Sequence, residues 1–164
     1  MKKLIFATIA VLIISGSATP HAFATPDAAV IAADCVAAQS IMSQLEKVDA
    51  VTRINRGREY TNTLNLLFAM NARLSANRVV APKLAEITAN FSDGVGGFRA
   101  DYDHYDDTLT NAIDVNCVAN TGEFYGRLET ARAARAKVSD DIANLDQLIN
   151  NYRDELNAVI GGIK

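Results

Sequence analysis

The sequence predicts an all-α protein, built as an elongated antiparallel hairpin or bundle of three helices with coiled-coil-like packing. Apolar residues recur at alternating spacings of three and four over long stretches, which is typical of helices laid along partner helices. The chain has only three prolines, and none lies inside a proposed helix. The longest apolar pattern comprises Phe124, Leu128, Ala131, Val138, Ile142, Leu145, Ile149, Tyr152, Leu156 and Val159.

The first 24 residues have the features of a cleavable secretory signal peptide. Two lysines precede an apolar run over residues 4–14, and small residues follow, ending in the A-x-A pattern Ala22-Phe23-Ala24. This run is much shorter than the ~20 residues that a membrane-spanning helix needs. We therefore expect cleavage after Ala24, export, and no stable membrane anchor on the single mature domain, residues 25–164.

The charge balance of the mature chain disfavours a nucleic-acid partner. Without Lys2 and Lys3, 14 of the 16 basic residues remain against 19 acidic ones, so the net charge is about −5. A protein that binds phosphate backbones needs a basic surface. The acidic balance is explained by solubility alone.

The two cysteines, Cys35 and Cys117, lie far apart in the sequence. In an exported protein, such a pair without a CxxC or CxxCH motif predicts one structural disulfide bond. Two free buried thiols or a bridge between two molecules are the alternatives.

The first helix is expected at about residues 26–75, with Thr25 as its N-cap and Pro26 at its first position. Its first apolar seam comprises Ile31, Cys35, Ala38, Ile41, Met42, Leu45 and Val48. Polar residues and Gly57 then interrupt the pattern, so we expect a stutter or slight bend there. The seam resumes at Tyr60, Leu64, Leu67, Phe68 and Leu74.

The second helix is expected at about residues 82–116, because Asn77 suits a helix end and Pro82 suits a helix beginning. Its seam comprises Leu84, Ile87, Phe91, Val95, Phe98, Tyr102, Tyr105, Leu109 and Ala112 or Ile113. Three glycines fall inside it, Gly94, Gly96 and Gly97. They either let a neighbouring helix come close or mark a kink; a phosphate-binding loop would need a downstream Lys or Ser/Thr that is missing.

The third helix is expected at about residues 122–160, ended by Gly161 and Gly162. An up-down-up arrangement at about 1.5 Å per residue puts ~62 Å between Cys35 and the first turn, and ~53 Å between Pro82 and Cys117. The two cysteines therefore return to the same height. A disulfide there would close a loop of roughly 80 residues and stabilise the fold by about 4 kcal/mol.

Arg135 is the one charged residue in the seam of the third helix. The same heights place it beside the aspartates of the second helix and near Asp49 on the first. We predict a polar layer in which Arg135 reaches Asp103, Asp106 or Asp49 and determines the register of the helices.

The acidic run from Asp101 to Asp107 offers the only candidate metal ligands, Asp103, His104 and Asp107, on the outer side of the predicted helix. Spacings of three and four residues can direct carboxylates and imidazole to one divalent cation. A solvated acidic face explains the same run without a metal.

His104 is the only histidine outside the signal peptide, so one chain cannot supply a catalytic triad or a multi-histidine zinc site. Met42 or Met70 opposite His104 would be the minimal ligand set for a haem, but core packing accounts for both methionines. We therefore expect no cofactor and no enzymatic activity.

The second half of the chain carries a recognisable pattern: Phe98-Arg99-Ala100-Asp101-Tyr102, Tyr105, Asn116-Cys117, Phe124-Tyr125, Leu128, Ala131-Arg132 and Arg135. It resembles a set of uncharacterised exported helical-hairpin proteins from ultrasmall candidate-phylum bacteria such as Saccharibacteria. The resemblance implies export and a helical hairpin. It brings no known activity and no catalytic residue to transfer.

These features predict an exported structural or protein-interaction bundle, at the cell surface, in the periplasm or in the medium, with an unknown protein partner. One alternative is an extracytoplasmic chaperone or client-binding module, which a wide exposed apolar stripe would favour. Another is a weak divalent-metal-binding protein. A homo-oligomer is a further expectation, because apolar residues are left unpaired near the open end: Phe68, Met70, Val79 and Val80.

Overall fold

The computed structural model describes residues 28–162, which form three α-helices: α1 (Ala28–Ala76), α2 (Pro82–Ile113) and α3 (Thr121–Gly162). The predicted signal peptide, its cleavage site after Ala24 and the expected helix start at Pro26 lie outside the described residues. Within residues 28–162 the regular secondary structure is entirely helical. The predicted all-α, three-helix fold is confirmed.

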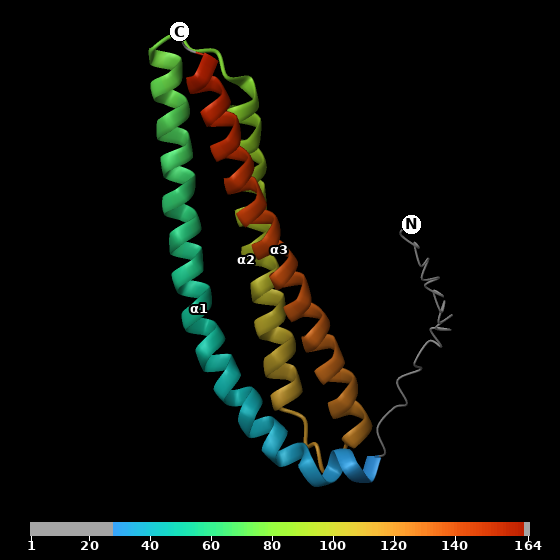
Figure 1. Cartoon of the computed structure of the whole chain (residues 1–164). Helices are drawn as coiled ribbons and strands as arrows, with labels where there is room; N and C mark the ends of the chain where they lie inside the picture. The colour runs from blue at the N-terminus through green and yellow to red at the C-terminus, as the bar shows by residue number, and fades with distance from the viewer. Residues whose placement is uncertain (1–27, 163–164) are drawn as a thin grey trace, which may run out of the picture.

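The chain runs along α1, turns back through α2 and turns again into α3, so consecutive helices are antiparallel (Figure 1). α2 packs against both other helices; its interface with α3 is the most extensive, and α1 and α3 touch each other least. α1 is bowed, its N-terminal end crosses beneath the ends of α2 and α3, and its concave side faces them (Figure 1). The three helices therefore enclose the core along α2.

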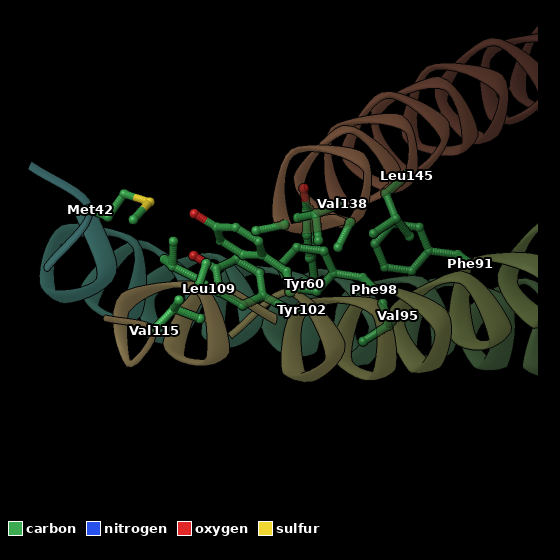
Figure 2. Close-up of a cluster of buried hydrophobic side chains, with 14 of the residues drawn as sticks. Met42, Tyr60, Phe91, Val95, Phe98, Tyr102, Leu109, Val115, Val138 and Leu145 are labelled. Atoms are coloured by element: carbon green, nitrogen blue, oxygen red, sulfur yellow. The ribbon is translucent and has the colours of Figure 1, made fainter. Parts of the chain in front are cut away.

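The core follows the apolar seam predicted for α2. Its buried apolar side chains are Leu84, Ile87, Phe91, Val95, Phe98, Tyr102, Tyr105, Leu109 and Ala112. Thr88, which the apolar pattern did not include, is buried beside them. Tyr60 of α1 stands edge-on to two of these rings, with centroid distances of 6.2 Å to Phe91 and 5.3 Å to Phe98 (Figure 2). Edge-to-face aromatic pairs add about 0.5–1.5 kcal/mol to the free energy of burial. α3 closes this core from the other side through its fully buried Leu145.

Cys35 and Cys117 pin one end of the bundle, as predicted. Their sulfur atoms are 2.19 Å apart and their Cα atoms 5.8 Å apart, across a sequence separation of 82 residues. Both cysteines are buried. The bond ties the beginning of α1 to the turn between α2 and α3, and closing so long a loop stabilises the fold by about 4 kcal/mol.

α2 ends at Ile113, three residues before the expected position at Asn116. Gln39 of α1 explains this end, because its Nε2 donates to the carbonyl oxygens of Ile113 (2.7 Å) and Val115 (2.6 Å). These carbonyls lie at the C-terminus of α2, where the helix itself supplies no donors. At the other turn α3 begins at Thr121, and it continues through both glycines that were expected to end it, to Gly162.

The three glycines of α2 do not break the helix, and only one of them lies at a close contact. A Cβ atom at Gly94 would lie 3.0 Å from Cδ2 of Leu145 on α3, whereas nothing lies within 4 Å of a Cβ at Gly96 or Gly97. Leu145 is fully buried and has little room to move. Gly94 therefore sets how closely α2 and α3 approach.

Alanine substitutions at these glycines are expected to have opposite effects. Gly96→Ala should raise the free energy of unfolding by roughly 0.5–1 kcal/mol, because alanine is the better helix former and meets open space. Gly94→Ala should lower it, because the new methyl group displaces Leu145 from a packed core. Urea denaturation followed by circular dichroism measures both. Equal stabilisation by both variants would show that Leu145 of α3 does not pack closely against Gly94.

Candidate functional site

The inner face of α1 is polar where it meets α2. The residues that turn inward recur every seven positions, in two sets: Cys35, Met42, Asp49 and Arg56, and Gln39, Glu46, Arg53, Tyr60 and Leu67. From residue 39 to residue 53 most of them are polar or charged. α1 is therefore attached to α2 over this length chiefly by hydrogen bonds and ion pairs.

Asp49 is the centre of these polar contacts. Tyr105 donates a hydrogen bond to Asp49 Oδ2 over 2.8 Å, and the Tyr102 hydroxyl donates to the backbone oxygen of the same residue. Nε of Arg135, from α3, lies 3.3 Å from the same Oδ2. The carboxylate side chain is 15% exposed and the arginine side chain 56% exposed. One side chain thus connects all three helices.

Burial changes the acidity of the two tyrosines at this centre. It raises the pKa of Tyr102 to about 12, and the negative charge of Asp49 acts in the same direction. The pKa of Tyr105 is raised further, by burial first and then by its hydrogen bond to Asp49. Both hydroxyls therefore keep their protons at neutral pH and act as hydrogen-bond donors.

The other residues predicted for the polar layer pair differently. Arg53 of α1 lies 2.7 Å from Asp103 and 3.9 Å from Asp106, and its guanidinium lies over the ring of Tyr102. The structure thus brings Arg135 to Asp49 and leaves Asp103 and Asp106 with Arg53. Arg53 was not among the residues predicted for the polar layer, although it lies at the same heptad position as Gln39, Glu46 and Tyr60.

A groove of about 450 Å³ opens beside Asp49, between α1 and α3 over α2. Its lining includes polar residues, namely Asp49, the two tyrosines, Arg132 and Arg135, and the apolar residues Val138 and Ile142. The groove exists because α1 and α3 make few direct contacts. It can hold an apolar side chain with hydrogen-bonding groups around it.

The candidate metal ligands lie elsewhere. Asp103, His104 and Asp107 are all exposed on α2, and Asp103 is bound to Arg53. Among residues 28–162, no three His, Cys, Asp or Glu side chains lie close enough together to hold a metal ion. Met42, considered as a haem ligand with His104, is buried in the core, whereas His104 faces outward.

Replacing Asp49 tests whether the three helices depend on it. Asp49→Ala should lower the free energy of unfolding by roughly 2–3 kcal/mol, because it leaves the Tyr105 hydroxyl and part of the Arg135 charge without a partner. The matched control is Asp107→Ala, an exposed aspartate of α2, whose effect should stay within about 0.5 kcal/mol. Chemical denaturation of both variants gives the comparison; similar losses would contradict the central role of Asp49.

A second polar cluster joins α2 and α3 through Asp101, Lys137 and Asp141. Lys137 Nζ lies 3.0 Å from Asp101 and 2.5 Å from Asp141. The other carboxylate oxygen of Asp141 is buried without a hydrogen-bond partner. Burial raises the pKa of Asp141, and the neighbouring Asp101 raises it further, whereas Lys137 lowers the pKa of Asp101. Ionisation of Asp101 therefore stabilises the folded protein, whereas ionisation of Asp141 destabilises it.

The pH dependence of stability should reveal these signs. Because the pKa of Asp141 is raised on folding, its contribution is favourable below the unfolded value of 3.8 and is lost as the pH rises through the folded pKa. Asp141→Asn should therefore match or exceed the wild-type melting temperature at pH 7, and the gain should vanish near pH 3.8. Asp101→Asn should lower the melting temperature at pH 7, because the pKa of Asp101 is lowered. Parallel pH profiles for the two variants would contradict this assignment.

The outer face of α1 is apolar, which corrects the predicted seam. Ile41 and Val48 were expected inside, but their exposed fractions are 66% and 62%. Both lie on the side of α1 opposite the inward-facing residues. Residues seven positions apart share one face of a helix, so Ile41 and Val48 lie together on this other face. With two neighbours on the same half of the helix they form an outer stripe, consisting of Val36, Ile41, Val48 and Val51. The exposed Ile54 instead borders a hollow beside Phe98 and Asp103 of α2. The apolar residues of α1 fall on two different faces of the helix in the sequence pattern, and this division could have indicated the exposed apolar face.

The open end of the bundle also leaves apolar groups exposed. Phe68 and Val80 are exposed, whereas Met70 and Val79 are half-buried. The prediction that Phe68 belongs to the buried seam of the first helix is therefore wrong, because the neighbouring Leu67 is the residue that turns inward.

Family models, curated proteins and solved structures give no match to this chain. Function is therefore argued from the geometry of its own residues. Within residues 28–162, no helix combines the length and the apolar character that crossing a bilayer requires.

Proposed function

We propose that this chain is an exported helical bundle that binds a protein partner through the outer stripe of α1. The observation that carries the proposal is the inverted polarity of α1. Its polar side chains face α2, and four β-branched apolar side chains, each more than half exposed, lie on the opposite side. Eight of the eleven large apolar side chains exposed within residues 28–162 belong to this one helix.

This distribution favours binding over chance exposure. Single exposed apolar residues are common, but contiguous apolar patches mark interaction surfaces. α2 and α3 are arranged conventionally, with apolar residues buried and polar residues outside. The exposed apolar residues of the stripe lie in the N-terminal half of α1, which polar contacts to α2 and the disulfide bond hold in place. The position of the stripe is therefore fixed relative to the rest of the bundle.

Export is supported by two features. The N-terminal pattern is that of a secretory signal peptide, and the two cysteines lie at bonding distance, which suits an oxidising compartment. The partner would then be met outside the cytoplasm. Metal binding is not proposed, because the candidate ligands do not converge within the described residues.

Site-specific photo-crosslinking on the producing cells tests the proposed function. A photoreactive side chain at Val48 should give a defined adduct, identified by mass spectrometry, because this position lies in the middle of the stripe. The matched control is Ala133, which is exposed on α3. Adducts that are absent from position 48, or no stronger there than at position 133, would refute the proposal.

Client binding is a second candidate, favoured by the groove beside Asp49. A groove of about 450 Å³ that is partly lined by apolar residues can accept a side chain of an unfolded protein. Ile142→Glu, in the lining of that groove, would then weaken suppression of aggregation of a reduced client protein, whereas Val48→Glu would not. If Val48→Glu weakened the suppression of aggregation and Ile142→Glu did not, client binding would be assigned to the outer stripe.

A further inference from the structure

The groove beside Asp49 is lined by two arginine side chains that use little of their hydrogen-bonding capacity on the described part of the chain. Arg132 and Arg135 lie three positions apart on α3, so both reach the same side of this helix. Arg135 contacts Asp49 through Nε, over 3.3 Å, and Arg132 contacts Glu129 through Nη1; these are their only ion pairs among residues 28–162. A guanidinium group has five N–H donors. Most of these donors therefore remain for an anion that enters the groove.

The charge of the lining favours an anionic ligand. Two guanidinium groups against one carboxylate leave the lining with a net charge of +1. The carboxylate of Asp49 also accepts a hydrogen bond from Tyr105, over 2.8 Å, and keeps it when Arg135 binds a ligand. The pair of Arg132 with Glu129 is exposed on both sides, and such pairs are weak because water screens their charges. Both arginines can therefore share their charge with a ligand.

Apolar surface lies within the same groove. Ala136, Val138 and Ile142 of α3 contribute to its lining, together with Tyr102 and Tyr105 of α2. Both tyrosine hydroxyls donate to Asp49, so the tyrosines offer a ligand their rings and not free hydroxyl groups. The volume of about 450 Å³ lies in the lower part of the range for small-molecule sites, roughly 300–1,000 Å³. A ligand that fits is small and has an apolar body.

We infer that the groove binds an organic carboxylate, in which one carboxylate group is carried on a compact apolar body. The carboxylate accepts hydrogen bonds from Arg132 and Arg135, because planar guanidinium groups match its two oxygens. The apolar body lies against Ala136 and Ile142, the apolar lining residues of α3 that are not fully buried. An inorganic anion leaves this apolar surface in water, and a neutral apolar molecule forms no charged contact, so each binds more weakly.

This inference does not rest on the outer stripe of α1, because it concerns a different face, between α1 and α3. A lack of acid binding would leave the crosslinking test at Val48 unaffected. A lack of crosslinking at Val48 would leave acid binding unaffected.

An NMR titration of the ¹⁵N-labelled, disulfide-bonded protein with 3-phenylpropanoate tests the inference. The groove is open, so we expect a dissociation constant on the order of 1 mM, with saturable amide shifts centred on residues 136–142 and Thr52. The alcohol 3-phenylpropan-1-ol has the same body without the charge, and acetate has the charge without the body; each should bind about tenfold more weakly or worse. Shifts that do not saturate by about 20 mM, shifts centred elsewhere, or equal binding of acid and alcohol overturn the inference.

A pair of arginine variants tests the charged contact. Arg132→Gln removes one guanidinium group and leaves the Asp49 contacts in place, and it should weaken acid binding roughly five-fold or more. The matched control is Arg153→Gln, at an arginine of α3 outside the groove whose side chain is equally exposed, at 63%; it should bind the acid like the wild type. Circular dichroism establishes that both variants are folded. Unchanged binding by Arg132→Gln, or equal losses in both variants, overturns the inference.

A peptide titration identifies the source of the carboxylate. A tripeptide that ends in phenylalanine carries the same chemistry at its free C-terminus, and its amidated form lacks the charge. Tighter binding of the free tripeptide than of 3-phenylpropanoate assigns the site to a polypeptide C-terminus, and the reverse order assigns it to a free organic acid. Both results support the carboxylate site. Binding of the amidated tripeptide as tight as that of the free form overturns it.

Discussion

The attachment of α1 to α2 through polar side chains is the constraint on which the rest of the structure depends. Between residues 39 and 53, α1 faces α2 with an amide, two carboxylates and a guanidinium, and each of these finds a partner: Gln39 with the end of α2, Glu46 with Thr110, Asp49 with Tyr102, Tyr105 and Arg135, and Arg53 with Asp103. Polar contacts of this kind are directional, so they specify rotation and register of the helix more strongly than apolar contacts do. Once that rotation is set, Ile41 and Val48 point outward.

This arrangement separates stability from recognition along one helix. The C-terminal half of α1 is held by apolar burial, with Tyr60 between Phe91 and Phe98. The N-terminal half is held by the Asp49 contacts and by the disulfide, which need no apolar side chains. The apolar residues of that half are therefore available for binding. The limited contact between α1 and α3 also leaves the groove beside Asp49.

Much of the fold could be predicted from the sequence because helix periodicity is a local property. The apolar residues of the α2 seam were all predicted, whereas the buried Thr88 was not, and the equal heights of Cys35 and Cys117 followed from helix length alone. The partner of Arg135 was narrowed to three aspartates, of which the structure brings Asp49 to it. The inner face of α1 could not be predicted from hydrophobicity, because hydrogen bonds to α2, and not apolar burial, decide which side turns inward.

The sequence by itself determined the three helices, the turn at Pro82 and the buried seams of α2 and α3, because propensity and periodicity act over a few residues. The tertiary structure alone decided the rotation of α1, the pairing of Arg53 with Asp103 and the role of Gly94, which lies against Leu145 while Gly96 faces open space. Each of these depends on atoms that are distant in the chain and meet only when the helices pack.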